Sequence, residues 1–109
     1  ISLPRITGNE TPASLSGIIV TDLLRNQLQY DGIIITDAMN MGAVAQNYSA
    51  SQAAVMALEA GVDIILMPSD FYSAYYGVLE AVEQQRISQE RIDESLRHIL
   101  NVKLSLLEQ

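Results

Sequence analysis

The sequence contains no cysteine and few basic residues, and each shortage argues against a class of function. Without cysteine the chain can form neither a disulfide nor a thiolate metal site, which leaves the redox compartment open. Six Lys and Arg residues stand against 13 Asp and Glu residues, for a net charge of −7. That charge argues against a nucleic-acid backbone or an anionic membrane surface as the partner.

Long apolar runs are also missing. No run approaches the roughly 18 residues needed to span a bilayer, and residues 1–5 lack the basic region and apolar core of a secretory signal. The sequence does not begin with Met, so we expect a piece of a longer polypeptide, whose cytoplasmic or secreted location stays open. With 109 residues, 49% of them hydrophobic, the chain has the size of one small globular domain.

One stretch, residues 33–41, organises the rest of the chain. It begins with the apolar, β-branched run Ile33–Ile35 and ends in Thr36, Asp37 and a flexible stretch. Such a run is typical of a strand that is buried on both faces of a parallel sheet. Asp37 would then lie at the carboxyl end of the strand, where α/β folds place their chemistry. The alternative is that Asp37 only caps the following turn.

The other segments alternate between helical and strand patterns. Residues 1–15 predict a loop, residues 16–85 predict helix, strand, helix, strand and helix in order, and residues 88–107 predict a terminal helix. The second strand, at 63–67, begins about 30 residues after the first, as in a strand–helix–strand unit. The fold class is therefore α/β with a parallel sheet. Two parallel strands cannot close a barrel, so the sheet is incomplete within this chain.

Local signals mark where the helices begin, end and pack. Ser16 is the expected N-cap of the first helix, and Ser49 with Gln52 fits a capping box. Gly61 is the expected stop, while Asp70 and Ser88 precede the last two helices. Apolar positions at helical spacing predict an inward face in the first of these two helices, formed by Tyr75, Val78, Leu79 and Val82. In the last helix they lie along one side: Ile92, Leu96, Ile99, Leu100, Leu104 and Leu107.

These motifs, in this order and spacing, resemble family 3 of the glycoside hydrolases. More narrowly, they are similar to its bacterial β-N-acetylglucosaminidase (β-hexosaminidase) branch. The resemblance covers nearly the whole chain and is carried by Pro12–Ser16, Leu23–Arg25, Tyr30–Met41, Ala60–Pro68, Ile92–Ser95 and Ile99–Lys103. It implies that the chain is the C-terminal part of a (β/α)8 TIM-like barrel, with the seventh and eighth strands and their helices.

The resemblance also implies roles for two residues. The Asp of the family's Thr-Asp-Ala motif, here Asp37, is the catalytic nucleophile that forms a covalent glycosyl-enzyme intermediate. A carboxylate suits this role because it attacks without a further base and stabilises the positive charge that develops on the sugar. Met41 matches a residue near the bound sugar, although core packing explains a Met there equally well.

The group that protonates the leaving oxygen has no match in this sequence. In the family branch this group is a His paired with an Asp on an upstream loop. The residues that hold the N-acetyl sugar in the family also lie upstream and have no match here. We interpret His98, the single histidine, as a solvated or helix-end structural residue, and Asp70 and Ser69 as capping residues. The chain alone should therefore turn over nothing, and no cofactor or metal-ligand cluster is implied.

The expected activity of the parent protein is removal of terminal β-linked N-acetylglucosamine from peptidoglycan- or chitin-derived saccharides. A β-glucosidase or β-xylosidase of the same family is the nearest alternative. A second alternative is an inactive fragment whose exposed strand edges bind either the rest of the barrel or another copy of itself. A phosphoacceptor receiver domain is disfavoured, because the sequence lacks the acidic pair and the Lys that such a site needs.

Overall fold

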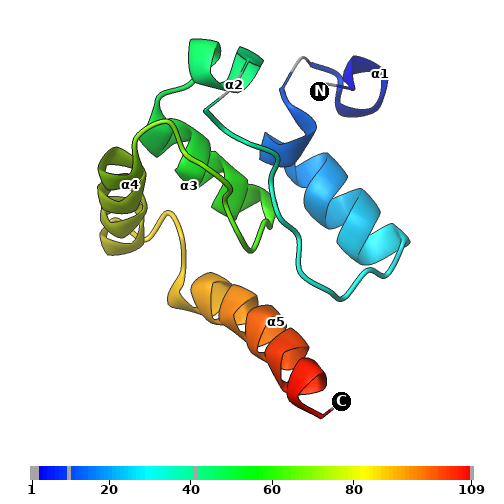
Figure 1. Cartoon of the computed structure of the whole chain (residues 1–109). Helices are drawn as coiled ribbons and strands as arrows, with labels where there is room; N and C mark the ends of the chain where they lie inside the picture. Colours follow the sequence, from blue (N-terminus) through cyan, green and yellow to red (C-terminus); the bar gives the residue numbers. More distant parts are fainter. Residues whose placement is uncertain (1–2, 10, 41, 109) are drawn as a thin grey trace.

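The computed structural model describes residues 3–9, 11–40 and 42–108, which form a set of helices joined by extended segments (Figure 1). No helix within these ranges is both long and apolar enough to cross a bilayer. The elements are α1 (Pro4–Thr7), the 3-10 helix η1 (Ala13–Leu15), the π-helix η2 (Ile18–Gln27), α2 (Gly42–Asn47), α3 (Ala50–Ala60), α4 (Phe71–Glu83) and α5 (Gln89–Leu107).

Among the described residues of the predicted loop 1–15, two short helical segments occur, α1 and η1. Pro4 opens the single-turn helix α1, where its fixed φ is already suited to a helix. Gly8 ends this turn in the left-handed conformation, and its N–H donates to the Pro4 carbonyl at 2.8 Å. The same two residues that suggest a loop therefore begin and end a helical turn.

The next helix begins near Ser16 as predicted, but the Ser16 side chain does not cap it. Helix η2 begins at Ile18 after Gly17, and no side chain caps it. Ser16 is buried, and it contributes its carbonyl, which accepts from the Val20 N–H at 2.9 Å. Ser16 therefore takes part in the first turn through its backbone rather than through its hydroxyl.

The remaining helix caps agree with the sequence. Ser49 Oγ accepts from the Gln52 N–H at 3.1 Å, and Gln52 Oε1 accepts from the Ser49 N–H at 3.0 Å, which completes the capping box of α3. Gly61 ends α3 with φ +115°, a conformation that side chains strongly disfavour. At the start of α4 the Asp70 carboxylate accepts from the Ser73 N–H, and at the start of α5 the Ser88 hydroxyl accepts from the Arg91 N–H.

The two expected strands pair in the predicted direction but do not form regular strands. Within the described ranges, segments 33–37 and 63–67 share one parallel bridge, between Ile35 and Ile64. The Thr36 N–H donates to the Ile64 carbonyl at 3.0 Å, and the Ile64 N–H to the Ile34 carbonyl at 3.1 Å. Each segment has a partner on one side, and two parallel segments alone are too few to stabilise a sheet.

The core lies around α3, between η2 and α4 (Figure 1). Small residues of α3 allow close approach: Ala53, Ala57 and Ala60 are buried in the main hydrophobic cluster. At the α3–α4 crossing a side-chain carbon at Gly77 would collide with Ser51. Helix α4 accordingly buries Ala74 and Ala81 rather than its large residues.

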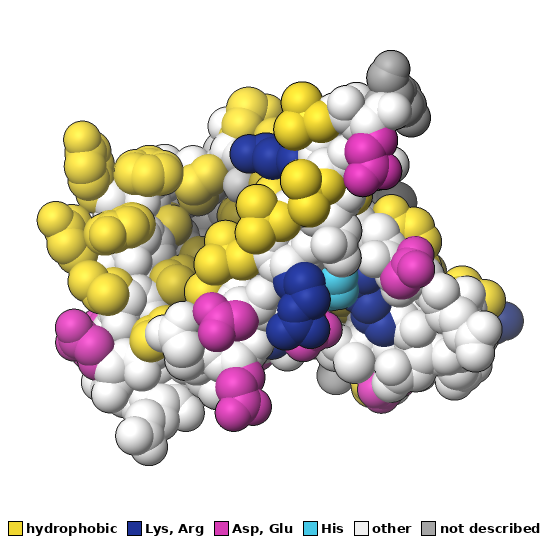
Figure 2. All heavy atoms as spheres, turned by 90° about the horizontal axis from the view of Figure 1, so that it is seen from below, with side chains coloured by type: hydrophobic (Ala, Val, Ile, Leu, Met, Phe, Trp, Pro, Cys, Tyr) yellow, Lys and Arg dark blue, Asp and Glu magenta, His cyan; other side chains and the backbone are white. Residues whose placement is uncertain are grey.

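This packing corrects the predicted inward faces. In α4, Val78 and Val82 pack against the core as expected, but Tyr75 and Leu79 are 55% and 42% exposed. In α5, Ile92 packs inward, while four leucines of its predicted apolar side are more than half exposed: Leu96, Leu100, Leu104 and Leu107. Figure 2 shows exposed hydrophobic side chains across the face seen from below. Apolar periodicity marked these residues correctly as apolar faces, but the chain itself does not cover them.

Candidate active site

Asp37 follows the bridged pair directly, and its neighbours are fixed to the second segment. The Thr36 hydroxyl accepts from the Leu66 N–H at 2.9 Å, and the Met39 N–H donates to the Leu66 carbonyl at 3.1 Å. Thr36 and Met39 are buried, at 4% and 2% exposure. The backbone on both sides of Asp37 is therefore held in place.

The Asp37 side chain itself is exposed. It lines a hollow of about 260 Å³ together with Ser14 of η1, Ile35 and other residues of η2 and the bridged pair. Within residues 3–9, 11–40 and 42–108, no ion pair or hydrogen bond engages its carboxylate. An exposed carboxylate on a fixed backbone is free to meet an incoming electrophile.

Met41, the predicted sugar contact, lies outside the described residues. Its neighbour Asn40 is an exposed turn residue, and helix α2 begins at Gly42. Asp70, at the start of α4, is exposed and caps the helix as expected. The hydrogen bonds from the Ser73 backbone N–H and hydroxyl lower the pKa of Asp70. Its place within the capping turn gives it a local structural role.

The sequence analysis missed a second carboxylate, Asp63, whose side chain is fully buried. Its Oδ2 accepts from Arg25 Nη2 at 2.6 Å and from the Ile34 N–H at 3.0 Å. Its Oδ1 accepts from the Ser95 hydroxyl at 2.7 Å and lies 3.0 Å from His98 Nδ1. We call these five residues the Asp63 network. A charged residue that opens an apolar strand was the available signal, because a buried charge needs partners.

The network corrects the interpretation of His98. Its side chain is 17% exposed and bonds to Asp63, so it is neither solvated nor a helix-end residue. Burial alone would raise the pKa of Asp63, but the hydrogen bonds of His98, Ser95 and Ile34 outweigh it and hold the pKa below its usual value. Asp63 is thus an ionised group whose charge is compensated on every side.

The two carboxylates lie at opposite ends of the bridged pair. Because the segments run parallel, Asp63 at the start of one lies beside Ile34 at the start of the other. Asp37 comes at the end of its segment, level with Leu66. The structure therefore does not bring His98 or Asp63 to the Asp37 site. In the described part of the chain, no group of three or more His, Cys, Asp or Glu residues is placed to hold a metal ion.

Comparisons with known proteins agree on one family. The model of the glycosyl hydrolase family 3 N-terminal domain matches residues 1–102. Beta-hexosaminidase A of Pseudoalteromonas piscicida is 34% identical over 104 residues, covering 87% of this chain and 17% of that protein. The lysosomal beta glucosidase of Dictyostelium discoideum is 32% identical over 102 residues, covering 90% of this chain and 12% of that protein.

Solved structures give the same result. A family 3 beta-N-acetylglucosaminidase from Paenibacillus sp. superposes with a TM-score of 0.88 at 39% identity, covering 93% of this chain and 20% of that one. The beta-N-acetylglucosaminidase of Thermotoga maritima superposes with a TM-score of 0.84 at 29% identity, covering 93% and 23%. In these relatives the domain is a TIM-barrel-type fold. The chain spans less than a quarter of each protein compared here.

Proposed function

Because this chain belongs to glycoside hydrolase family 3, we propose that it supplies the nucleophile, Asp37, of a retaining β-N-acetylglucosaminidase. The substrate is a peptidoglycan- or chitin-derived saccharide with a terminal β-linked N-acetylglucosamine. The hexosaminidase relatives support this choice. We further propose, from the resemblance to the family, that the chain is the C-terminal part of the barrel and contains its seventh and eighth strands.

The observation that carries the proposal is the state of Asp37. Its carboxylate is exposed and lines a hollow, while Thr36 and Met39 fix the backbone around it. In the retaining mechanism this carboxylate attacks the anomeric carbon, and the aglycone oxygen leaves with a proton from a second group. Water then hydrolyses the glycosyl-enzyme ester, which releases the sugar with its configuration retained.

The second group comes from outside this chain in our proposal. Retaining enzymes hold their two catalytic groups about 5–5.5 Å apart, whereas His98 is committed to the network at the opposite end of the bridged pair. The isolated chain is therefore inactive and needs the rest of the barrel, which would cover exposed residues such as Ile35, Leu66 and Met67. Self-association through the same surfaces is the alternative.

A β-glucosidase is the second candidate, and the Dictyostelium relative favours it. The choice between the two substrates depends on residues that hold the group at the sugar's second carbon. Comparing turnover of aryl β-N-acetylglucosaminide and aryl β-glucoside by the full-length protein distinguishes them, and we expect the first to be preferred.

The nucleophile is tested by covalent trapping in the full-length protein. A 5-fluoro glycosyl fluoride of N-acetylglucosamine should accumulate as an ester, and mass spectrometry of the digested protein should locate it on Asp37. Asp70→Asn is the matched control, because Asp70 is also an exposed acid that follows one of the bridged segments. Labelling of a different carboxylate would overturn the assignment.

A further inference from the structure

Four of the chain's six aromatic residues occupy the first two turns of α4. They form two rows at i, i+4 spacing, which we call the inner row (Phe71 and Tyr75) and the outer row (Tyr72 and Tyr76). All four are exposed, by 65%, 55%, 71% and 61% in that order. The chain has few aromatic side chains, so this exposed cluster is a candidate binding surface.

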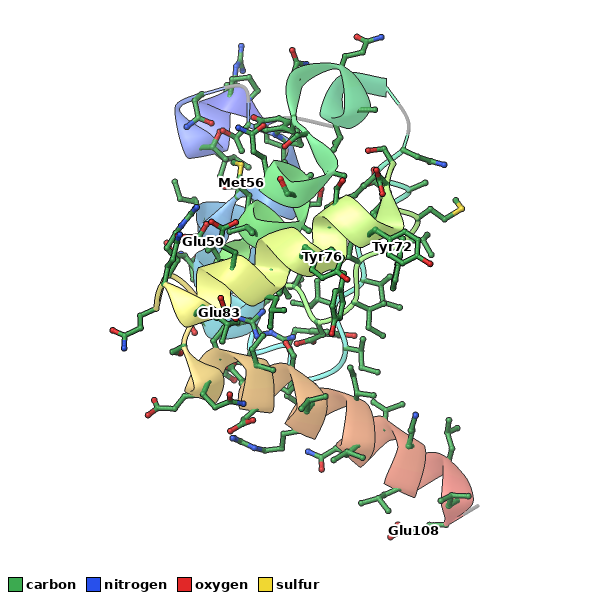
Figure 3. The ribbon with its side chains drawn as sticks, turned by 90° about the vertical axis from the view of Figure 1, so that its left-hand side faces the viewer. Met56, Glu59, Tyr72, Tyr76, Glu83 and Glu108 are labelled. Carbon is green, nitrogen blue, oxygen red and sulfur yellow. The ribbon has the colours of Figure 1, made fainter. Side chains whose placement is uncertain are left out.

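The two rows face different surroundings. The inner row lines an apolar hollow of about 220 Å³ with Ile65 and Val78, next to the second bridged segment. The outer row lies on the side of α4 opposite to Ala74 and Ala81, which are buried. Figure 3 views α4 from the outer side of the molecule, with Tyr72 and Tyr76 labelled on it. The inner row therefore faces the bridged pair, and the outer row points away from the buried side of α4.

Ring packing holds the outer row in a repeated orientation. The Phe71 and Tyr75 rings stack with planes 21° apart and centroids 6.3 Å apart. Tyr72 stands edge-on to Phe71 at 80° and 5.7 Å, and Tyr76 stands edge-on to Tyr75 at 83° and 5.4 Å. The outer tyrosines are therefore presented one helical turn apart, each braced in the same manner, rather than as freely rotating side chains.

We propose that Tyr72 and Tyr76 form an accessory surface that binds a neutral, β-linked glycan chain beside the Asp37 site; this rests on the proposed function. Tyrosine rings stack on the apolar C–H faces of sugar rings, and their hydroxyls bond to sugar hydroxyls. Two rings in a repeated orientation suit a polymer of repeated units. Helix α4 contains Glu80 and Glu83 but no Lys or Arg, which disfavours an anionic polymer.

The location supports a surface that serves the same reaction. Helix α4 begins just after residues 68–70, at the end of the second segment. Asp37 ends the first segment at the same edge, because the Met39 N–H bonds to the Leu66 carbonyl. A glycan held on the outer row would therefore be kept near the end of the pair at which the nucleophile is exposed.

The test measures retention of the full-length protein on insoluble chitin. In Tyr72→Ala/Tyr76→Ala we expect retention to weaken about tenfold, as for two lost ring contacts. The Tyr72→Phe/Tyr76→Phe variant keeps both rings and should retain most of the binding. Leu79→Ala is the matched control, because it removes exposed apolar surface from the same helix without removing a ring. Turnover of a short aryl glycoside should be unchanged in all three variants.

Unchanged chitin retention in the double alanine variant, with its native circular dichroism preserved, would overturn the proposal. So would a change in sedimentation without a change in retention, because the outer row would then be a protein interface. Asp37→Ala should keep full chitin retention. A wrong nucleophile assignment would therefore show in the turnover of Asp37→Ala, and a wrong accessory surface in the chitin retention of the tyrosine variants.

Discussion

Two aspartates of the same parallel pair have opposite surroundings. Asp63 is fully buried and bonds to Arg25, Ser95, His98 and the Ile34 N–H. Asp37 is exposed, and within the described residues no hydrogen bond or ion pair engages its carboxylate. The two residues have the same side chain, so residue type does not explain the difference. The difference follows from the end of the segment at which each carboxylate lies.

The contrast follows from the cost of burying charge. An ionised carboxylate leaves water only where donors replace its hydration, so Asp63 gathers partners from η2, segment 33–37 and α5. A nucleophile needs the reverse, because a carboxylate that is fully engaged by donors is a poor attacking group. In barrel folds the carboxyl ends of the strands carry chemistry and the amino ends carry stability. The role that we propose for Asp37 and the network around Asp63 would follow this division.

Loss of the Asp37 carboxylate should give the largest effect. In the full-length protein, Asp37→Ala should lower glycoside turnover by about 10⁴-fold or more, because no other group forms the covalent intermediate. Its unfolding free energy should stay close to that of the native protein, since the side chain is exposed. Steady-state kinetics and urea unfolding measure the two quantities. Near-normal turnover in Asp37→Ala would show that Asp37 is not the nucleophile.

Loss of the Asp63 carboxylate should give the reverse pattern. Asp63→Ala leaves the largely buried Arg25 guanidinium and His98 without their carboxylate partner, and we expect about 3–5 kcal/mol of lost stability. Glu59→Ala is the control, because the Glu59–Arg86 ion pair is exposed and should contribute less than about 1 kcal/mol. Urea unfolding compares them. Equal effects of the two substitutions would show that the Asp63 network does not stabilise the fold.

Replacement of His98 sharpens the comparison, because His98 bonds to Asp63 and lies far from Asp37 in the bridged pair. His98→Ala removes one of four donors, and we expect about 1–3 kcal/mol of destabilisation. His98→Asn, whose amide can still donate, should recover part of this loss. A fall in kcat at unchanged stability would instead indicate that His98 takes part in catalysis.

Acid should destabilise the protein through Asp63. The pKa of Asp63 is lower in the folded state than its ordinary value of 3.8, so its stabilising contribution is fully present above that value. The contribution is lost as the pH falls through the ordinary value toward the folded pKa. Unfolding free energy measured from pH 6 downward should therefore decline in this window, and less so in Asp63→Asn. The same slope in both proteins would assign the acid sensitivity to other carboxylates.

Met41 should give the smallest effect. We propose that it contacts the bound sugar, so Met41→Ala should raise KM severalfold, about 1 kcal/mol of binding, with little change in kcat. Met41→Leu should keep most of the contact, because it conserves apolar volume. If the alanine variant loses stability while KM is unchanged, the alternative of core packing is correct.

Sequence reasoning succeeded where the determining interactions are local. The Ser49–Gln52 capping box, the Gly61 stop, the cap at Asp70 and the helix start near Ser88 each depend on residues within one helical turn, and all agree with the structure. It failed at Ser16, which is buried and whose hydroxyl does not cap η2. It also failed at Tyr75 and Leu79, because periodicity identifies an apolar face but not which neighbour covers it.

The sequence by itself determined the family, the caps of α3 and α4 and the placement of Asp37 at the end of an apolar run. Tertiary structure decided that segments 33–37 and 63–67 meet in one bridge, and that Asp63 is the centre of a buried network. Its partners Ile34, Ser95, His98 and Arg25 lie 29, 32, 35 and 38 residues away along the chain. Local patterns carry no information over such separations, because burial and hydrogen-bond partners exist only after distant segments have packed together.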